Sequence, residues 1–509
     1  MIPLEWMPPL MFGGLVIFML IGFPVAFSLM AAGLFFSLIA MSEGFFGMAF
    51  LQAIPQRIFG SVLANDLLLA IPFFTFMGAI LERCGLAEEM LDSMGQLFGR
   101  VRGGLGYSVI IVGFILGAIT GTVAAQVIAM AMISLPVMMR YGYNMRYATG
   151  VLAASGTITQ LVPPSLVLIV LADQLKTQSG SADVGSMYLG AWGPSLLQIA
   201  LFALYTFCLT RLRPNDLPSL PESDLTLRGL ALWKKCLMGI IPSAVLIFLV
   251  LGTIMAGIAT PTESGAMGAM GALLLAWIRR ASISNLKGLI QEAYQNTMRI
   301  TTMVVFILIG STCFSVVFQG VDGGRWVEEL FSNLPGGWIG FLIVVNLFIF
   351  FLAFFLDFFE IAFIVVPLLA PVAVKLLSPV LLDSMNGNPE AAASAALVWF
   401  GVMLCVNMQT SFMHPPFGFA LFYLRGVAPK EVKSSDIYWG ALPWVGLQLV
   451  MVVVVMAFPA LVTTFLDKPA PVIQSQDFNF TGEESKPESS SNKIDEDAPV
   501  IFQLDRPVK

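Results

Sequence analysis

Residues 104–140 read GLGYSVIIVGFILGAITGTVAAQVIAMAMISLPVMMR, and residues 148–174 read ATGVLAASGTITQLVPPSLVLIVLADQ. Both stretches are apolar enough to lie in lipid, yet each is interrupted midway, by GAITGT at 117–122 and by SGTITQLVPPS at 155–165. No water inside a bilayer can satisfy a freed backbone N–H or C=O, so a broken membrane helix persists only where it is buried or lines a solvated cavity. Two breaks in succession therefore predict helix ends directed at one ligand site near the middle of the membrane.

The composition places the whole chain in the membrane class. Of its 509 residues 57% are apolar and 11% are charged, which is more apolar surface than one soluble core can bury. Many segments approach or exceed the roughly 20 residues that cross a bilayer as a helix. The five cysteines are scattered without a CxxC spacing, and His414 is the only histidine. We therefore expect no disulfide, no cofactor, no histidine-based zinc site and no Ser-His catalysis.

We predict an all-α polytopic membrane protein with two inverted repeats, each made of a re-entrant helical hairpin and an unwound transmembrane helix. The first long membrane segment is expected at 9–41. N-terminal scaffold helices (1–81) are expected to precede a first transport repeat (82–186), which has a hairpin at 104–140 and a broken helix at 148–172. Connecting scaffold helices (187–319) lead to a second transport repeat (320–438), which has a hairpin at 338–374 and a broken helix at 394–424. A C-terminal helix (439–467) and a polar, disordered tail (468–509) follow.

The repeat is visible in two proline pairs. Pro163-Pro164 follows SGTITQLV, and Pro415-Pro416 follows NMQTSFMH. An apolar segment with a break in its middle precedes each pair. Broken segments at corresponding places in two halves are typical of the binding site of a secondary transporter. The alternative is that each proline pair only kinks an ordinary helix.

The distribution of Lys and Arg predicts that the repeats are inverted. If 104–140 enters and leaves on one side, the connections around it share that side with 211–235, 279–299 and 425–438. Excluding the tail, this side collects 17 Lys and Arg residues, whereas the other side has only four, Arg57, Lys176, Arg325 and Lys375. Basic residues favour the cytoplasmic side. Five crossings separate the two hairpins, so the second hairpin is expected to enter from the opposite face.

The breaks carry groups that suit both an anion and a small cation. Free N–H groups at half-helix N-termini favour a carboxylate, and unwound carbonyls with hydroxyl side chains offer hard oxygen ligands. The candidate ion- and substrate-binding residues are Gly117, Thr120, Gly121, Thr122, Ser155, Gly156, Thr157 and Thr159 in the first half, and Asp357, Asn407, Gln409, Thr410 and Ser411 in the second. The candidate hinge residues are Pro163, Pro164, Pro415 and Pro416.

Alternatives remain for these residues. Asp357 and Glu360 lie mid-hairpin in an apolar run, where an ionisable group is costly and by default functional; otherwise both lie at a turn open to water. The hydroxyl of each threonine can instead bond to its own helix. Because the sequence has no ladder of buried carboxylates for a proton relay, we expect sodium rather than proton coupling, and no bound metal beyond the transported sodium.

Eight motifs, taken in order, resemble those of the large membrane subunit of tripartite ATP-independent periplasmic (TRAP) transporters, over roughly residues 10–465. They are GFPVAFSL (22–29), IPFFTFMGAIL (71–81), GAITGTVAAQ (117–126), YGYNMRYATG (141–150), SGTITQLVPPS (155–165), ATPTESGAMG (259–268), FLD (355–357) and PPFG (415–418). The chain departs from the family pattern at Gln126, where many relatives have an acidic residue, at Thr120 and Thr122, where serine is commoner, and at His414, where threonine is usual. We expect His414 to be a neutral hydrogen-bonding residue; the alternative is that it touches substrate.

The resemblance implies an elevator-type sodium symporter that takes up organic acids with a recognised carboxylate. It implies two protein partners, a small four-helix membrane (Q) subunit and a periplasmic substrate-binding (P) protein, and a multi-pass location in the bacterial inner membrane. Beyond these partners, the lipid bilayer and the substrate, no nucleic acid is expected. The alternative function is a sodium symporter of divalent anions without a binding protein. An enzyme is not expected, because one histidine and no HExxH motif leave no catalytic set.

Overall fold

The computed structural model describes residues 3–468, except 226–228, 281–284, 333 and 416–417. The expected polar tail thus lies, from residue 469 on, outside the described residues. Within the described part the secondary structure is helical, apart from one isolated antiparallel bridge between Lys176 and Ser181. Seven of these helices are long and apolar enough to cross a membrane, or up to ten spans if each of three bent pairs counts as one. The predicted all-α polytopic fold is confirmed.

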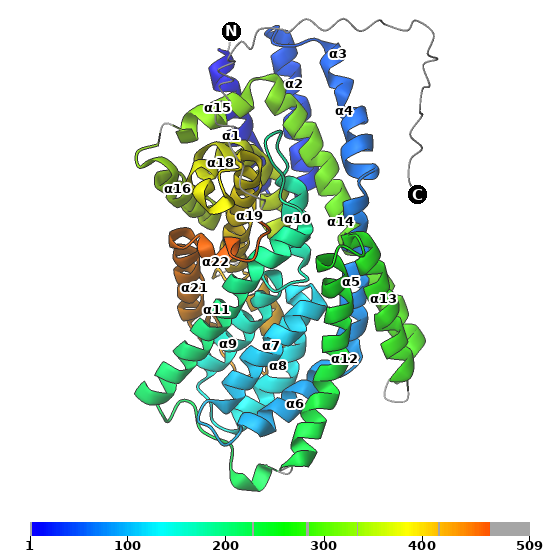
Figure 1. Ribbon diagram of the computed structural model, residues 1–509, viewed down its shortest axis with the longest axis vertical. Coiled ribbons are helices and arrows are strands. Elements are labelled where there is room, and N and C mark those ends of the chain that lie inside the picture. The colour runs from blue at the N-terminus through cyan, green and yellow to red at the C-terminus, as the bar shows by residue number, and fades with distance from the viewer. Residues whose placement is uncertain (1–2, 226–228, 281–284, 333, 416–417, 469–509) are drawn as a thin grey trace, which may run out of the picture. The chain divides into compact units, whose positions relative to one another are not determined.

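The N-terminal segment differs from the expected single span at 9–41. After η1 (Leu4–Trp6), α1 (Met7–Leu20) and α2 (Val25–Ser42) form a helical hairpin (Figure 1). Gly22 has a φ of 95° and Pro24 lacks an N–H, so the helix cannot run through this turn. A Cβ added at Gly14 would lie 2.7 Å from the Phe36 ring, which shows how closely the two helices pack. The chain continues through α3 (Met48–Leu51), α4 (Ala53–Arg57), the π-helix η2 (Ile58–Leu63), η3 (Asp66–Leu69) and α5 (Ala70–Arg83).

The first pair of breaks lies inside the GAITGT and SGTITQLVPPS interruptions. The elements are α6 (Leu86–Phe98), α7 (Gly104–Thr120), α8 (Val123–Arg140), α9 (Met145–Thr157), η4 (Ile158–Gln160) and α10 (Leu166–Gln174). Helix α7 ends because Gly121 takes a φ of 62°, a left-handed conformation that glycine adopts without steric cost. The second break leaves 161–165 outside any helix, between η4 and α10.

One buried amide fastens the first hairpin to the helix that follows it. Gln126 of α8 donates through Nε2 to the carbonyls of Gly113 (2.6 Å) and Ser155 (2.9 Å), so it links α7, α8 and α9. Its side chain is only 1% exposed. A Cβ at Gly113 would lie 2.8 Å from the Ser155 Cβ, which is why α7 and α9 can approach so closely. Gln126, one of the four residues that depart from the family pattern, therefore has a structural role here.

The connecting helices are α11 (Val184–Leu212), η5 (Glu222–Asp224), α12 (Leu230–Met255), α13 (Pro261–Ile278) and α14 (Leu286–Gly320). Of these, α14 packs against α2 of the N-terminal hairpin, whereas α13 packs on α5 and α12 on α6. Helix α14 begins 14 residues before the expected span at 300–319, so most of the expected 279–299 loop is helical. A Cβ at Gly33 would lie 3.1 Å from the Phe314 Cα, and one at Gly310 would lie 2.5 Å from the Ala26 carbonyl oxygen. Small residues thus let the backbones of α2 and α14 meet, as is common between membrane helices.

The second repeat has the same order of elements with different lengths. Its elements and the C-terminal ones are α15 (Gly323–Ser332), α16 (Gly337–Leu352), α17 (Phe358–Ile364), α18 (Val366–Leu381), η6 (Asp383–Met385), α19 (Pro389–Met408), η7 (Gln409–Phe412), α20 (Phe419–Val427), α21 (Ser434–Ala457) and α22 (Ala460–Thr463).

Three helix ends in this half lie away from their expected positions. The second hairpin runs to Leu381 rather than 374, because Lys375 points outward and pairs with Glu328 (2.5 Å). Helix α19 begins at Pro389, inside the polar stretch 382–394, where the Asn388 side chain accepts hydrogen bonds from two N–H groups of the first turn. The helix expected over 439–467 ends at Ala457, because Pro459 cannot continue it.

Contacts between connections show that the hairpins enter from opposite ends. The N–H of Gly103 donates to the Leu217 carbonyl (3.1 Å) and that of Asn144 to the Asp216 carbonyl (2.9 Å), so the chain enters and leaves the first hairpin at the same loop. At this end Arg83 pairs with Glu292, Lys235 with Asp92 and Arg279 with Glu89. The Lys375–Glu328 pair of the second hairpin lies at the other end (Figure 1, α15 and α18 above, α7 and α8 below). The predicted inversion is confirmed.

Surface labelling tests this sidedness. Single cysteines at Arg102 and Arg140 flank the first hairpin and are both exposed, whereas Gly324 is exposed at the opposite end. With the exposed native cysteine removed as Cys208→Ser, we expect a membrane-impermeant maleimide to label R102C and R140C from one side and G324C from the other. Labelling of R102C and R140C from different sides would contradict the hairpin.

A stability measurement tests the role of Gln126. The substitution Gln126→Ala leaves two buried carbonyls without these donors, which we expect to cost about 1–2 kcal/mol and to lower the Tm in detergent. Gln52→Ala is the matched control, because Gln52 is exposed. Equal Tm values for the two variants would show that the amide does not hold the hairpin.

Candidate functional site

The tip of the first hairpin meets the unwound part of its own repeat. Thr159 of η4 donates through Oγ1 to the Gly117 carbonyl (2.8 Å) near the end of α7. A Cβ at Gly117 would lie 3.1 Å from the Thr159 Cα, so only a glycine allows this approach without a shift. Thr122 is the N-cap of α8 but gives it no side-chain hydrogen bond, so its own side chain does not cap the first N–H groups of α8. Thr120 is the last residue of α7, and its side chain is not among the described ones.

The other first-half candidates lie buried on α9. Gly156 packs on α8, since a Cβ there would lie 2.2 Å from the Val127 side chain. The hydroxyl of Ser155 is buried and has no hydrogen-bond partner among the described residues. Thr157 bonds back to the Ala154 carbonyl (2.9 Å), as the alternative interpretation anticipates, and also accepts from Gln448 Nε2 (3.0 Å). Beside the first break, the Ser155 hydroxyl thus has no described partner, whereas the Thr157 hydroxyl bonds to both Ala154 and Gln448.

At the second hairpin tip, Asp357 and Glu360 hold each other in a capping box. The Glu360 N–H donates to Asp357 Oδ1 and the Asp357 N–H donates to Glu360 Oε2, both at 3.0 Å. These bonds satisfy two N–H groups at the start of α17. Both residues are half-buried. The carboxylates therefore start the helix, and a sodium-binding role for Asp357 stays a prediction.

The unwound part of the second repeat is held by amides. Asn407 donates through Nδ2 to the Asn346 carbonyl (2.8 Å) and to Asn346 Oδ1 (2.9 Å), which ties α19 to α16. The Asn407 Oδ1 atom is buried without a described partner. Thr410 and Ser411 bond back to the carbonyls of Asn407 and Met408, both at 2.7 Å, so their hydroxyl protons are used within their own helix.

A buried cluster of amides joins the two breaks. Gln409 of η7 accepts from Gln198 Nε2 of α11 (2.9 Å), and Gln448 of α21 donates to Thr157 and, more weakly, to Gln409 (3.5 Å). The side chains are at most 3% exposed, and each retains a buried polar atom without a described partner, as does nearby Gln160 of η4. Sequence analysis singled out Thr157 and Gln409 but missed Gln198 and Gln448. The available signal was a lone amide in an otherwise apolar helix.

The described hinge prolines lie between helices in both repeats. Pro163 and Pro164, joined by a cis peptide bond, lie between η4 and α10. Pro415 lies between η7 and α20, whereas Pro416 falls outside the described residues. His414 is buried and stacks on the Phe354 ring at a centroid distance of 4.1 Å. The backbone of Ala353 lies beside the His414 ring, and the expected role of His414 as a neutral hydrogen-bonding residue stays a prediction.

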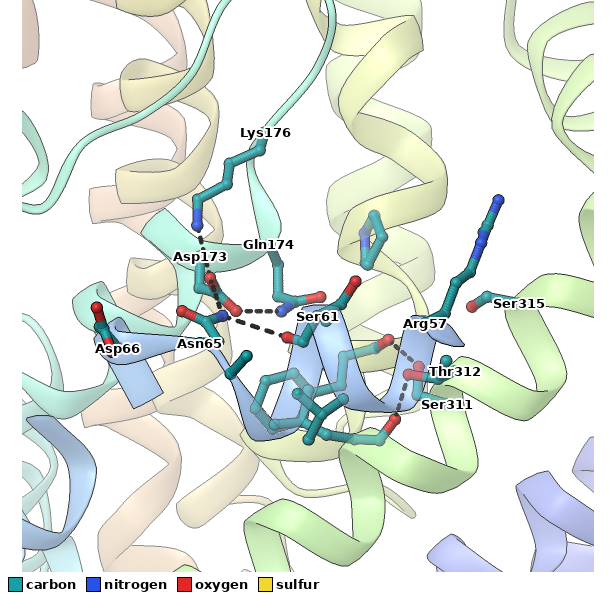
Figure 2. A pocket seen from close by; sticks show the side chains of 16 residues that line it. Arg57, Ser61, Asn65, Asp66, Asp173, Gln174, Lys176, Ser311, Thr312 and Ser315 are labelled. Atoms are coloured by element: carbon teal, nitrogen blue, oxygen red, sulfur yellow. Dashed lines mark hydrogen bonds and ion pairs between the residues drawn. The ribbon is translucent and has the colours of Figure 1, made fainter. Parts of the chain in front are cut away.

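A polar cavity of about 560 Å³ lies between η2, the end of α10, α14 and the second hairpin (Figure 2). Its charged lining residues are Arg57, Asp66, Asp173 and Lys176. None of them was a sequence-based site candidate, although Arg57 and Lys176 are among the four basic residues assigned to the outer side. Four hydroxyl side chains, Ser61, Ser311, Thr312 and Ser315, also line it.

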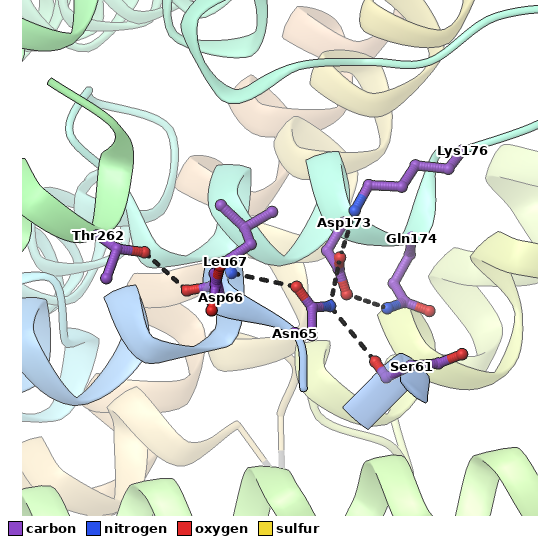
Figure 3. A network of polar contacts seen from close by, with 8 residues as sticks. All are labelled: Ser61, Asn65, Asp66, Leu67, Asp173, Gln174, Lys176 and Thr262. Carbon is purple, nitrogen blue, oxygen red and sulfur yellow. Dashed lines mark hydrogen bonds and ion pairs between the residues drawn. The ribbon is translucent and has the colours of Figure 1, made fainter. Parts of the chain in front are cut away.

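A network beside this cavity crosses between the predicted scaffold and transport parts (Figure 3). Asp173 of α10 accepts from Asn65 Nδ2 (2.9 Å), Lys176 Nζ (2.7 Å) and Gln174 Nε2 (2.9 Å). Thr262 of the ATPTE motif donates to the Asp66 carbonyl (2.7 Å). The turn before η3 is therefore held from both sides, by α10 and by α13.

A second cavity, of about 940 Å³, has a different chemistry. It lies against the α1–α2 turn, α14 and the end of α16, and Glu360 is the one charged residue of its described lining. Phe23, Phe27, Phe351 and Phe355 are among the apolar residues around it. Such a lining suits acyl chains better than it suits a hydrophilic anion.

Known proteins resemble this chain along almost its whole length. The sequence model of the tripartite ATP-independent periplasmic transporter, DctM component, matches residues 12–461. The C4-dicarboxylate TRAP transporter large permease protein DctM of Rhodobacter capsulatus is 27% identical over 465 residues, which cover 89% of this chain and 97% of that protein. The isethionate TRAP transporter permease protein DctMQ of Oleidesulfovibrio alaskensis is 24% identical over 453 residues, 89% of this chain and 65% of that protein.

Among solved structures, the YdaH transporter of Alcanivorax borkumensis shares the fold. Its TM-score is 0.53 at 15% sequence identity, and the match covers 80% of this chain and 88% of that one. At this identity the likeness shows the fold alone. The family match spans both hairpins and both unwound segments, and this chain therefore belongs to the DctM family, the large permease components of tripartite ATP-independent periplasmic transporters.

Proposed function

We propose that this chain takes up an organic anion with a carboxylate group across the bacterial inner membrane, coupled to sodium and dependent on a periplasmic binding protein. The observation that carries the proposal is the family match over 12–461, which includes both breaks. A relative named for a C4-dicarboxylate supports a carboxylate substrate, and one named for isethionate, a sulfonate, supports the broader class of small organic anions. The chain is proposed to act as a transporter and not as an enzyme, with no cofactor.

The sodium sites are proposed at the two breaks. At the first, the Gly117 carbonyl, Thr120, Thr122 and the unpartnered Ser155 hydroxyl offer neutral oxygens. At the second, Asp357 and the unpartnered Asn407 Oδ1 offer a charged and a neutral oxygen. Neutral oxygen ligands with few charges suit a monovalent cation better than a divalent one. The anion is proposed to lie near the start of α8, where the helix dipole adds positive potential.

Packing between the repeats supports an elevator motion. Helix α10 of the first repeat packs on α17 of the second, and α20 of the second packs on α8 of the first. Each hairpin thus rests on the half-helix beyond the break of the other repeat, and the amide cluster joins the breaks themselves. These elements are built to move together against α2, α5, α13 and α14.

The partners follow from the family. The DctMQ relative is one chain of which this chain covers 65%, which fits a small membrane (Q) subunit as a separate partner here. The periplasmic (P) binding protein is proposed as the donor of the anion. The alternative is a sodium symporter of divalent anions that needs no binding protein.

Uptake into proteoliposomes tests the proposal and its alternative. With this chain and its small subunit in the membrane, binding protein outside and an inward sodium gradient, we expect accumulation of labelled succinate, the probe for a C4-dicarboxylate. We expect accumulation to stop when sodium is replaced by potassium or when the binding protein is omitted. Uptake that persists without the binding protein would favour the alternative, and uptake that persists without sodium would contradict sodium coupling. A parallel thermal-shift screen of the binding protein against organic acids identifies the substrate if succinate is not taken up.

Two substitutions at Asp357 separate its charge from its capping role. Asparagine caps helices as well as aspartate does, so Asp357→Asn retains the cap and removes the charge, whereas Asp357→Ala removes both. If the carboxylate binds sodium, both variants should raise the sodium concentration for half-maximal uptake about tenfold or more, as should Thr120→Ala to a smaller extent. Asp383→Asn, in η6 outside both breaks, is the control. An unchanged sodium titration in D357N and T120A would contradict the assignment.

A further inference from the structure

The polar cavity beside η2 lies where an anion would pass between the predicted scaffold and transport parts. Arg57, Ser61 and Asp66 come from the N-terminal elements and Ser315 from α14, whereas Asp173 and Lys176 come from the end of α10. Pro367 of the second hairpin completes the lining. The cavity lies in the half of the molecule away from the 211–235 loop, since α4 and α10 lie above α7 and α8 in Figure 1, and the proposed function makes this the periplasmic half.

Arg57 gives one end of this cavity an uncompensated positive charge. Its Nη1 donates to Gln319 Oε1 (2.8 Å), a neutral partner, and no described carboxylate forms an ion pair with it. A guanidinium has five N–H donors, so most of them remain available. Arginine presents these donors in a planar fork that matches a carboxylate.

Two serine hydroxyls of the same cavity are available to donate hydrogen bonds to an anion beside Arg57. The hydroxyls of Ser61 and Ser315 line the cavity and have no hydrogen bond to a described residue. Ser311 and Thr312, in contrast, already donate to the carbonyls of Phe363 (2.5 Å) and Leu308 (2.8 Å). Ser61 lies in the π-helix η2, and π-helical turns are frequent at functional sites.

The acidic residues of the cavity are either compensated or distant. The Asp173 carboxylate accepts from Lys176, Asn65 and Gln174, so its charge is already balanced. Asp66 and Asp173 lie at the opposite end of the lining from Arg57 (Figure 2). An anion is therefore favoured at the end formed by Arg57 and Ser315, and disfavoured at the other.

We propose that Arg57, with the Ser61 and Ser315 hydroxyls, forms an entry site that holds the carboxylate of the transported anion before it reaches the breaks. The proposal rests on the proposed function for the identity of the ligand and for the outer side. It assigns to Arg57 a role in substrate capture, distinct from the proposed sodium sites at Asp357 and Thr120. The cavity of about 560 Å³ has room for a small organic acid.

Charged thiol reagents test the site without any transport. In the full chain with its small subunit and with Cys208→Ser, Thr312→Cys places a thiol in the cavity and leaves both proposed serine hydroxyls in place. We expect Arg57→Gln to slow modification by the anionic reagent methanethiosulfonate ethylsulfonate about fivefold and to speed modification by its trimethylammonium counterpart. Arg57→Lys, which retains the charge, and Arg325→Gln, an arginine of α15 that pairs with Glu329 outside the cavity, should leave both rates within twofold.

Ligand protection then tests the carboxylate. We expect succinate to slow modification of T312C in the Arg57 chain and not in R57Q. Equal modification rates with and without Arg57 would overturn the site, and so would protection by inorganic phosphate but not by succinate. Because the assay needs neither sodium nor binding protein, it distinguishes failure of this site from failure of the proposed uptake, which the proteoliposome experiment measures separately.

Discussion

Every interruption of a helix inside this protein has to be satisfied by other parts of the chain, because lipid offers no hydrogen bonds. The structure shows how this is done. Gln126 takes up the carbonyls of Gly113 and Ser155, and the side chains of Ser165 and Cys405 both donate to the Gln160 carbonyl. Asn407 donates to the Asn346 carbonyl inside α16 and so fastens α19 to that helix. At the first repeat's second break the hydroxyl and thiol donors therefore meet a freed carbonyl, whereas the amides of Gln126 and Asn407 hold neighbouring helices against the breaks.

The same requirement explains why the two breaks lie together. Thr157 of the first repeat and Gln409 of the second are joined through Gln448, and Gln198 completes the contact from α11. An isolated break would need its own set of partners, whereas two breaks that face each other share them. The buried polar atoms that remain unpaired, among them the Ser155 hydroxyl and Asn407 Oδ1, are costly unless a ligand or water meets them. This cost is the physical reason for the sodium sites that we propose at the breaks.

Contacts between the predicted scaffold and transport parts are of another kind. Near η2 they include polar, partly buried contacts such as the bond between Asn65 and Asp173, while α2 and α14, both in the predicted scaffold, meet through glycines in the apolar packing. Exposed polar contacts are weak and exchange readily with water. Weak polar contacts at this surface are consistent with the proposed elevator motion, and the close contact of α2 with α14 is consistent with a part proposed to stay fixed.

The order of residues alone was enough to predict the membrane class, the two hairpins, the two proline-marked breaks and their inversion. These features depend on local quantities: apolar length, the residues that interrupt it and the balance of Lys and Arg at its ends. Helix ends that depend on a single cap or on a distant ion pair, such as those at Asn388 and Lys375, were misplaced by several residues, and the N-terminal span proved to be a hairpin.

The candidate residues Thr157, Thr159, Asn407 and Gln409 do lie at the breaks. The capping role of Asp357, the stacking of His414, the amides Gln198 and Gln448, and the cavity around Arg57 depend on residues far apart in the chain. Only the packing of the helices brings those residues together. A local sequence pattern does not predict which distant side chain will donate to a given carbonyl or pair with a given charge.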